Sequence, residues 1–117
     1  MKEDNQIVID SKAFAIRIIR LYKYLSEKKR EYVMSNQVLR SGTSIGANIN
    51  EGVFAQSRLD FISKMSIALK EANETKYWLE LLVETEYISK QQYDSLVGDV
   101  NKIIGTLVNI INTTKSK

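Results

Sequence analysis

Residues 39–52 carry four polar side chains at helical spacing. The series consists of Arg40, Ser44, Asn48 and Glu51, separated by four, four and three residues. On a helix this spacing forms one stripe, in which arginine donates, the carboxylate accepts, and the hydroxyl and amide do both. Two interpretations follow: a structural polar network, exposed or at a subunit interface, and a recognition surface for phosphate or RNA. We favour the network, because polar networks commonly fix packing register and specificity.

A second chemically distinctive feature is the uneven distribution of charge. Residues 11–40 hold eight basic and two acidic side chains, a net charge of +6. Residues 59–99 hold four basic and eight acidic side chains, a net charge of −4. Such asymmetry is typical of a polyanion-binding face or of a head-to-tail contact between subunits.

The basic residues lie in and just after one predicted helix. Those placed to follow a phosphate backbone are Arg17, Arg20, Lys23, Lys28, Lys29 and Arg30. Tyr22, Tyr24 and Tyr32 are interleaved with them and offer rings on which unpaired bases can stack. The alternative is a solvated helix face whose last cations suit the helix dipole.

The composition argues against a catalytic site and against a metal site. The chain has no His and no Cys, so it lacks the commonest acid–base group and metal ligand and any thiolate ligand. Two-metal bundles use Glu-x-x-His pairs; Glu71 and Glu74 have the spacing without the His, and we expect them to pair with basic residues of a neighbour. Gly42 and Gly46 lack the Lys-Ser/Thr that completes a phosphate-binding loop. The sequence predicts no enzyme, no metal and no cofactor.

The elements that position these residues are predicted to be helices. In four successive segments the apolar residues recur every three or four positions, and the chain has no Pro to interrupt them. Short connections between long helices force antiparallel neighbours. We predict an all-α fold, an antiparallel up-down-up-down four-helix bundle that residues 1–117 form as a single domain. The expected helices cover about 11–30, 36–54, 58–86 and 89–114, with Asp10, Ser35, Ser57 and Ser89 as N-caps.

Two of these helices carry more than a simple core stripe. Gly42, Gly46 and Gly52 each cost about 1 kcal/mol relative to Ala, so we expect a neighbouring helix or ring to approach closely there; a break near Gly42 is the alternative. The first helix has a second apolar stripe around Ile19, buried within the bundle or against a second subunit. The predicted core contains Phe14, Leu21, Ile45, Ile49, Met65, Leu79, Leu96, Ile103 and Leu107.

The length and the N-terminus indicate the setting of the protein. A chain of 117 residues with 44% hydrophobic and 26% charged residues has the composition of one globular domain. No apolar run approaches the roughly 18 residues of a membrane span. The polar, acidic start lacks the features of a secretory signal. We expect a cytoplasmic protein that does not enter membranes.

A family resemblance extends these inferences. The run LRSGTSIGANINEG at 39–52, followed by DFISKMSIALKEANETKYWLELL and TEYIS, resembles the four-helix bundle proteins encoded within intervening sequences of bacterial large-subunit ribosomal RNA genes. The resemblance covers about Phe14 to Thr113. It extends to the accessory protein of diversity-generating retroelements, which implies a pentameric assembly that associates with a reverse transcriptase and nucleic acid. The matching positions are Arg40, Ser41, Ser44, Ile45, Asn48, Ile49, Glu51, Gly52, Glu74 and Leu79.

These observations lead to one functional prediction and one alternative. The prediction is a non-enzymatic, homo-oligomeric scaffold that binds RNA or DNA through the basic face of the first helix. The charge asymmetry suits a ring of heterologous contacts, and the resemblance makes a pentamer the first expectation. The polar stripe, together with Glu74, is assigned to a structural network or to the interface between copies. The alternative is a protein–protein adaptor that docks a nucleic-acid enzyme and does not itself contact nucleic acid.

Overall fold

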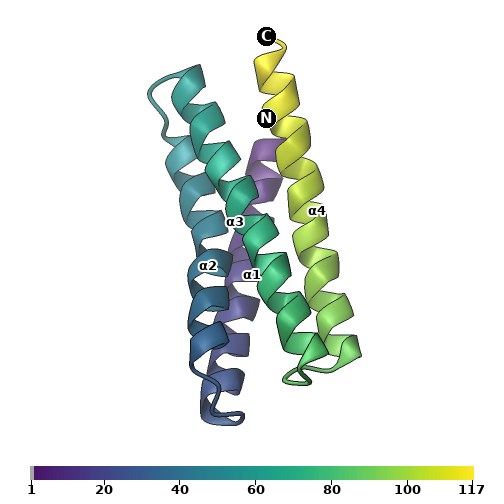
Figure 1. Cartoon of the computed structure of the whole chain (residues 1–117). Coiled ribbons are helices and arrows are strands. Elements are labelled where there is room, and N and C mark those ends of the chain that lie inside the picture. Colours follow the sequence, from purple (N-terminus) through teal and green to yellow (C-terminus); the bar gives the residue numbers. More distant parts are fainter. Residues whose placement is uncertain (1) are drawn as a thin grey trace.

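The computed structural model describes residues 2–117, with side chains described from Gln6 onward, and is built from four helices (Figure 1). Consecutive helices run antiparallel and pack on one another, and α1 also packs on α4. The predicted up-down-up-down bundle is therefore confirmed. The helices span Lys2–Glu27 (α1), Val33–Val53 (α2), Arg58–Glu84 (α3) and Lys90–Lys115 (α4).

The start of α1 differs from the prediction. The helix begins at the second residue rather than near residue 11, so Asp10 lies inside the helix and is not its N-cap. Ile7, which is 1% exposed, continues the core stripe about two turns beyond Phe14, and the Asp10 carboxylate accepts a hydrogen bond from Gln6 at 2.9 Å. Apolar burial therefore extends the helix past a residue with capping propensity. At its other end α1 stops at Glu27, because the chain turns at Arg30 with φ 53°.

The N-terminus of α2 is capped by a residue that the sequence analysis did not assign. Ser35 is not the N-cap but lies fully buried in the first turn, where its hydroxyl donates to the Glu31 carbonyl at 2.7 Å. The Glu31 carboxylate accepts from the backbone N–H groups of Val33, Met34 and Ser35 at 3.3, 3.1 and 2.8 Å. These donors have no partner within the helix, and a negative charge suits the helix N-terminus. Glu31 is therefore structural.

The starts of α3 and α4 follow the prediction. Ser57 Oγ accepts a hydrogen bond from the Asp60 N–H at 3.1 Å. Ser89 Oγ accepts from the Gln92 N–H at 3.1 Å, and Gln92 Oε1 accepts from the Ser89 N–H at 2.8 Å, which completes a capping box. α3 ends two residues before the predicted boundary, because Glu86 turns the chain with φ 67°.

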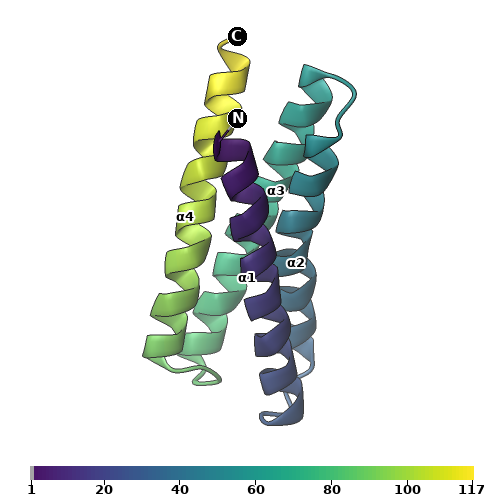
Figure 2. The same ribbon diagram turned by 180° about the vertical axis from the view of Figure 1, so that it is seen from behind.

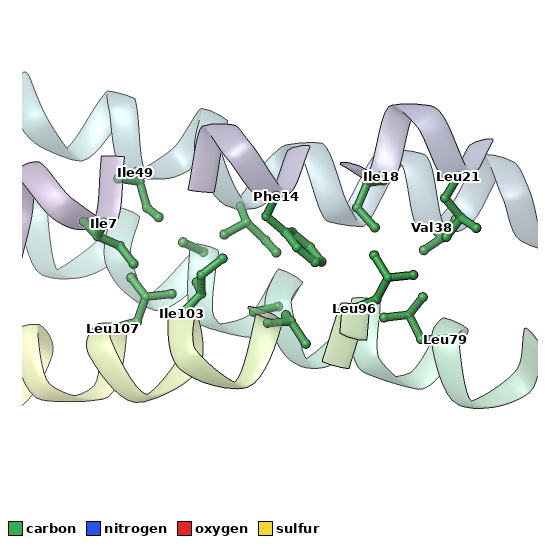
Figure 3. Packing of buried hydrophobic residues seen from close by; sticks show 14 of the residues in the cluster. Ile7, Phe14, Ile18, Leu21, Val38, Ile49, Leu79, Leu96, Ile103 and Leu107 are labelled. Carbon is green, nitrogen blue, oxygen red and sulfur yellow. The ribbon is translucent and has the colours of Figure 1, made fainter. Parts of the chain in front are cut away.

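The core is an apolar layer to which all four helices contribute (Figure 3), and every predicted core residue is buried. α2 runs unbroken, and its glycines allow the predicted close approach. A Cβ at Gly42 would lie 2.8 Å from the Ile18 side chain, and one at Gly46 would lie 3.4 Å from Ser11 Oγ. α1 therefore packs directly against the α2 backbone. Within residues 2–117, no helix carries an apolar stretch of the length that crossing a bilayer requires.

Candidate nucleic-acid interface

The seam between α1 and α4 is the open side of the bundle. The two helices diverge toward the end that carries the α3–α4 turn (Figure 2), and a groove of about 320 Å³ lies between them. Leu21 and Leu96, which are 7% and 4% exposed, give it an apolar floor. The remaining lining residues are Arg17, Arg20, Tyr24 and Gln92. Two of the six predicted basic residues therefore border this groove.

Arg17 is held across the α1–α4 seam. Its Nη1 donates to Asp99 Oδ2 at 2.6 Å and to the Ser95 carbonyl at 3.3 Å, while Nη2 donates to Ser95 Oγ at 2.9 Å. The Arg17 and Asp99 side chains are 37% and 49% exposed, so water screens their attraction. Arg17 therefore connects α1 to α4, a structural role that the sequence did not indicate. Contact between Arg17 and a phosphate stays a prediction.

The other five basic residues gather at the end of α1 and in the turn that follows it. All are exposed: Arg20, Lys23, Lys28, Lys29 and Arg30. Over residues 6–117, none of these five forms an ion pair. The acidic residues nearby are Glu27 and Glu31, next to the cluster in the chain, and Glu86, which lines a hollow together with Lys29. The Glu31 carboxylate is turned toward the start of α2. This end of α1 therefore carries an excess of positive charge that no ion pair offsets.

The three interleaved tyrosines occupy different environments. Tyr24 is half-buried and lines the groove, with Lys29 Nζ 5.8 Å from its ring centroid. Tyr22 is also half-buried but does not line the groove. Tyr32 directly precedes α2 and is 55% exposed. Of the three, Tyr24 is the ring that lies beside both apolar floor and cations.

A second hollow adjoins the groove and shares Tyr24 and Gln92 with it. It lies at the α3–α4 turn, where Tyr87 and Lys90 are among its lining residues. The hydrogen bond from Lys90 Nζ to Asp94 at 2.7 Å raises the pKa of the Lys90 ammonium, which stays cationic at neutral pH. The sequence analysis did not identify Tyr87 and Lys90, because these residues lie far along the chain from the basic residues of α1.

The polar stripe of α2 lies along the seam with α3. Arg40 Nη1 donates to Glu71 at 3.2 Å, and Arg40 Nη2 donates to Glu74. The Glu74 carboxylate also accepts from Trp78 Nε1 at 3.0 Å. The two glutamates at i,i+3 therefore pair with a basic residue of the neighbouring helix, and Glu74 connects Arg40 to the indole ring.

The other three residues of the stripe also have hydrogen-bond or ion-pair partners in α2 or α3. Ser44 Oγ donates to the Arg40 carbonyl at 2.6 Å, and Asn48 Nδ2 donates to the Ser44 carbonyl at 2.8 Å. Glu51 lies 3.5 Å from Lys64 Nζ of α3. Arg40 and Glu51 therefore pair with residues of α3, whereas Ser44 and Asn48 bond backbone carbonyls of α2. Whether the stripe serves as a structural network or as an interface between copies stays a prediction.

A buried polar pair on the same seam was not singled out from the sequence. Ser41 and Thr75 are both fully buried, and Thr75 Oγ1 donates to Ser41 Oγ at 2.9 Å. The sequence feature that could have indicated this pair is a hydroxyl residue on the buried face of each of the two helices, α2 and α3. Throughout the part of the chain whose side chains are described, no cluster of three or more His, Cys, Asp or Glu side chains is arranged to hold a metal ion.

Comparison with known proteins places this bundle among related chains. The family model described as 23S rRNA-intervening sequence protein matches residues 3–109. A crystal structure of a protein of unknown function from the S23 ribosomal protein family of Bacteroides thetaiotaomicron is 57% identical in sequence. The match covers 94% of this chain and 98% of that chain, with a TM-score of 0.93. No curated protein matches this chain significantly.

Proposed function

This chain belongs to the 23S rRNA-intervening sequence protein family, and we propose that it is a non-enzymatic helical scaffold that binds RNA or DNA. The contact surface is the basic cluster at the end of α1. This cluster is defined as Arg20, Lys23, Lys28, Lys29 and Arg30.

The observation that carries the proposal is the absence of ion-pair partners for the basic cluster within residues 6–117. Some cations elsewhere are paired, as Arg17 is with Asp99 and Arg40 with two glutamates. Others, such as Lys70 and Lys76 of α3, have no ion pair in the described residues but stand next to or near acidic residues of their own helix, so what distinguishes the basic cluster is that five unpaired cations gather at one end. Unmatched cations at one end of an elongated bundle produce a local positive potential that attracts polyanions. Contact with phosphates releases condensed counterions, so the binding should weaken steeply as salt rises.

The test is charge reversal within the basic cluster. The variant Arg20→Glu/Lys23→Glu/Lys29→Glu leaves Arg17 in place, so the α1–α4 seam keeps its ion pair. We expect the affinity for a fluorescently labelled RNA or DNA, measured by anisotropy at low salt, to fall roughly tenfold or more. The dependence of log affinity on log salt should also become shallower, because fewer phosphates are contacted.

The matched control is Lys70→Glu/Lys115→Glu/Lys117→Glu, which reverses three exposed cations outside the cluster. Both variants change the net charge from +3 to −3. Equal loss of affinity in the two would mean that total charge, and not the cluster, governs binding. Circular dichroism of both variants checks that helicity is retained.

We also propose that the scaffold is a homo-oligomer, with a ring as its form and a pentamer as the first expectation from the family resemblance. The outward face of α1 supports this proposal, because Ile16 and Ile19 are 41% and 40% exposed and Ile9 is 61% exposed. Sedimentation equilibrium tests it against the monomer mass of 13.4 kDa. Ile16→Glu should weaken assembly, whereas Ile67→Glu, at a site 38% exposed on α3, serves as the control.

The adaptor alternative is favoured by apolar residues at the other end of the bundle. Phe54, the first residue of the α2–α3 connection, is 83% exposed, and Leu59 at the start of α3 and Val53 at the end of α2 are 78% and 48% exposed. An apolar docking site of this kind would hold a protein partner with little dependence on salt. The adaptor becomes the better account if oligonucleotide binding is undetectable at low salt.

A further inference from the structure

We propose that the groove between α1 and α4 receives one unpaired base of a single-stranded nucleic acid, with Tyr24 as its stacking platform. This inference rests on the proposed function, because it names the class of nucleic acid that the basic cluster would hold. The contact is specific to single strands, since the bases of a duplex are paired and stacked inside the helix and offer no free face to a protein ring.

The first argument is the composition of the groove. Its floor is apolar and buried, formed by Leu21 and Leu96, while Tyr24 adds an aromatic face. A volume of about 320 Å³ is at the lower end of the ~300–1,000 Å³ typical of small-molecule sites. This size suits a single base. The groove therefore combines the two contacts that bases make most readily, stacking and apolar burial.

The second argument is the arrangement of hydrogen-bond donors around that floor. Arg17 is already anchored by Ser95 and Asp99, so ordering its side chain costs little on binding. Gln92 Oε1 is occupied by the Ser89 N–H, which leaves the amide NH₂ to donate at the groove edge. These donors suit the acceptor atoms on the edge of a base.

The third argument is continuity with the basic cluster. Arg20 lines the groove, and Lys29 lies beside the Tyr24 ring. A base seated over Leu21 and Leu96 would place its flanking phosphates beside cations that have no ion-pair partner in residues 6–117. Stacking and phosphate contact therefore come from neighbouring residues of α1 and the turn that follows it, and a combination of aromatic rings and cations is what single-strand-binding grooves use.

The experiment compares Tyr24→Leu with Tyr77→Leu, a control at a tyrosine of α3 that is 55% exposed. Binding is measured by anisotropy on a labelled single strand, in RNA and DNA arms, and on the duplex of the same sequence. Tyr24→Leu should lower single-strand affinity between about 5-fold and 150-fold, the loss of one base–aromatic stack. Duplex affinity should change less than about twofold, and Tyr77→Leu should change neither.

A second pair of variants keeps the test decisive if Tyr24→Leu does not fold. Gln92→Glu retains a carboxyl oxygen for the Ser89 N–H but removes the NH₂ donor and adds negative charge at the groove edge. Gln91→Glu adds the same charge at an exposed neighbouring position. We expect single-strand affinity to fall more for Gln92→Glu than for Gln91→Glu.

The outcomes separate this inference from the function on which it rests. Single-strand and duplex affinities that are equal, and unaffected by Tyr24→Leu and Gln92→Glu, would overturn the groove while leaving the basic cluster as the contact surface. Undetectable binding of every oligonucleotide at low salt would overturn both. Preference for a single strand that is lost in Tyr24→Leu supports the groove, and the RNA and DNA arms then identify which strand it takes.

Discussion

The α2–α3 seam and the α1–α4 seam are built from different contacts. On the α2–α3 side, Gly52 lies against Met65, and Thr75 donates to Ser41 in the interior. On the α1–α4 side the helices diverge, a groove remains, and Arg17 reaches across to α4. Both seams carry ion pairs between partly exposed side chains, but the α2–α3 seam also has a close glycine contact and a buried hydroxyl pair, whereas the α1–α4 seam retains a groove.

The connectivity of the chain accounts for part of this difference. α2 and α3 are joined by a short connection, which holds their ends together at all times, whereas α1 and α4 are the first and last helices and meet only through side-chain contacts. Residue size accounts for the rest, because a glycine in α2 faces α3 while long side chains line the other seam. The α2–α3 seam is therefore closely packed at Gly52, and the α1–α4 seam retains a groove.

The largest expected effect comes from filling the close contact of the α2–α3 seam. A Cβ at Gly52 would meet Met65 and lie 3.3 Å from the Lys64 Cβ, so Gly52→Leu should lower the free energy of unfolding by about 1–3 kcal/mol through overpacking. Gly98→Leu on α4, where a Cβ meets nothing within 4 Å, should instead raise it by up to about 1 kcal/mol. Urea unfolding followed by circular dichroism measures both. Equal destabilisation would contradict the contrast between the seams.

An intermediate effect is expected from the buried hydroxyl pair. Thr75→Val keeps the side-chain shape but removes the cross-helix partner of Ser41 Oγ, which then keeps only a long hydrogen bond of 3.5 Å to the Val38 carbonyl, at a cost of about 1–3 kcal/mol. Thr106, whose hydroxyl donates to the Lys102 carbonyl of its own helix at 3.0 Å, is the control, and Thr106→Val should stay within about 0.5 kcal/mol. Thermal unfolding of the two variants decides the matter, and a Thr75→Val protein as stable as the parent would show that the pair is dispensable.

The smallest effect is expected from the ion pair that bridges the open seam. A double-mutant cycle with Arg17→Met and Asp99→Asn should give a coupling of about 0.2–1 kcal/mol, because both side chains are partly exposed. The corresponding cycle with Arg40→Met and Glu74→Gln should give a larger value, since Glu74 also accepts from Trp78. A larger coupling for the Arg17 pair would mean that the open seam is the better-held one.

The amino-acid sequence determined the features that depend on neighbouring residues. Apolar spacing identified the four helices and all nine predicted core residues, since a helix brings positions three and four apart onto one face. The capping residues Ser57 and Ser89 were predictable because a cap bonds backbone groups only two or three residues away. The same local reasoning misplaced the start of α1, where burial of Ile7 outweighed the capping propensity of Asp10.

The tertiary structure alone decided which charged residues are already matched. Arg17 looks like its basic neighbours in the sequence, yet it is held by Asp99, which lies 82 positions further along the chain. The groove also exists only because α1 and α4 diverge, and no local pattern encodes the angle between the first and last helices. Distances between helices arise from side-chain packing summed over the whole core, which is why the sequence predicted a basic face while the structure alone revealed a groove beside it.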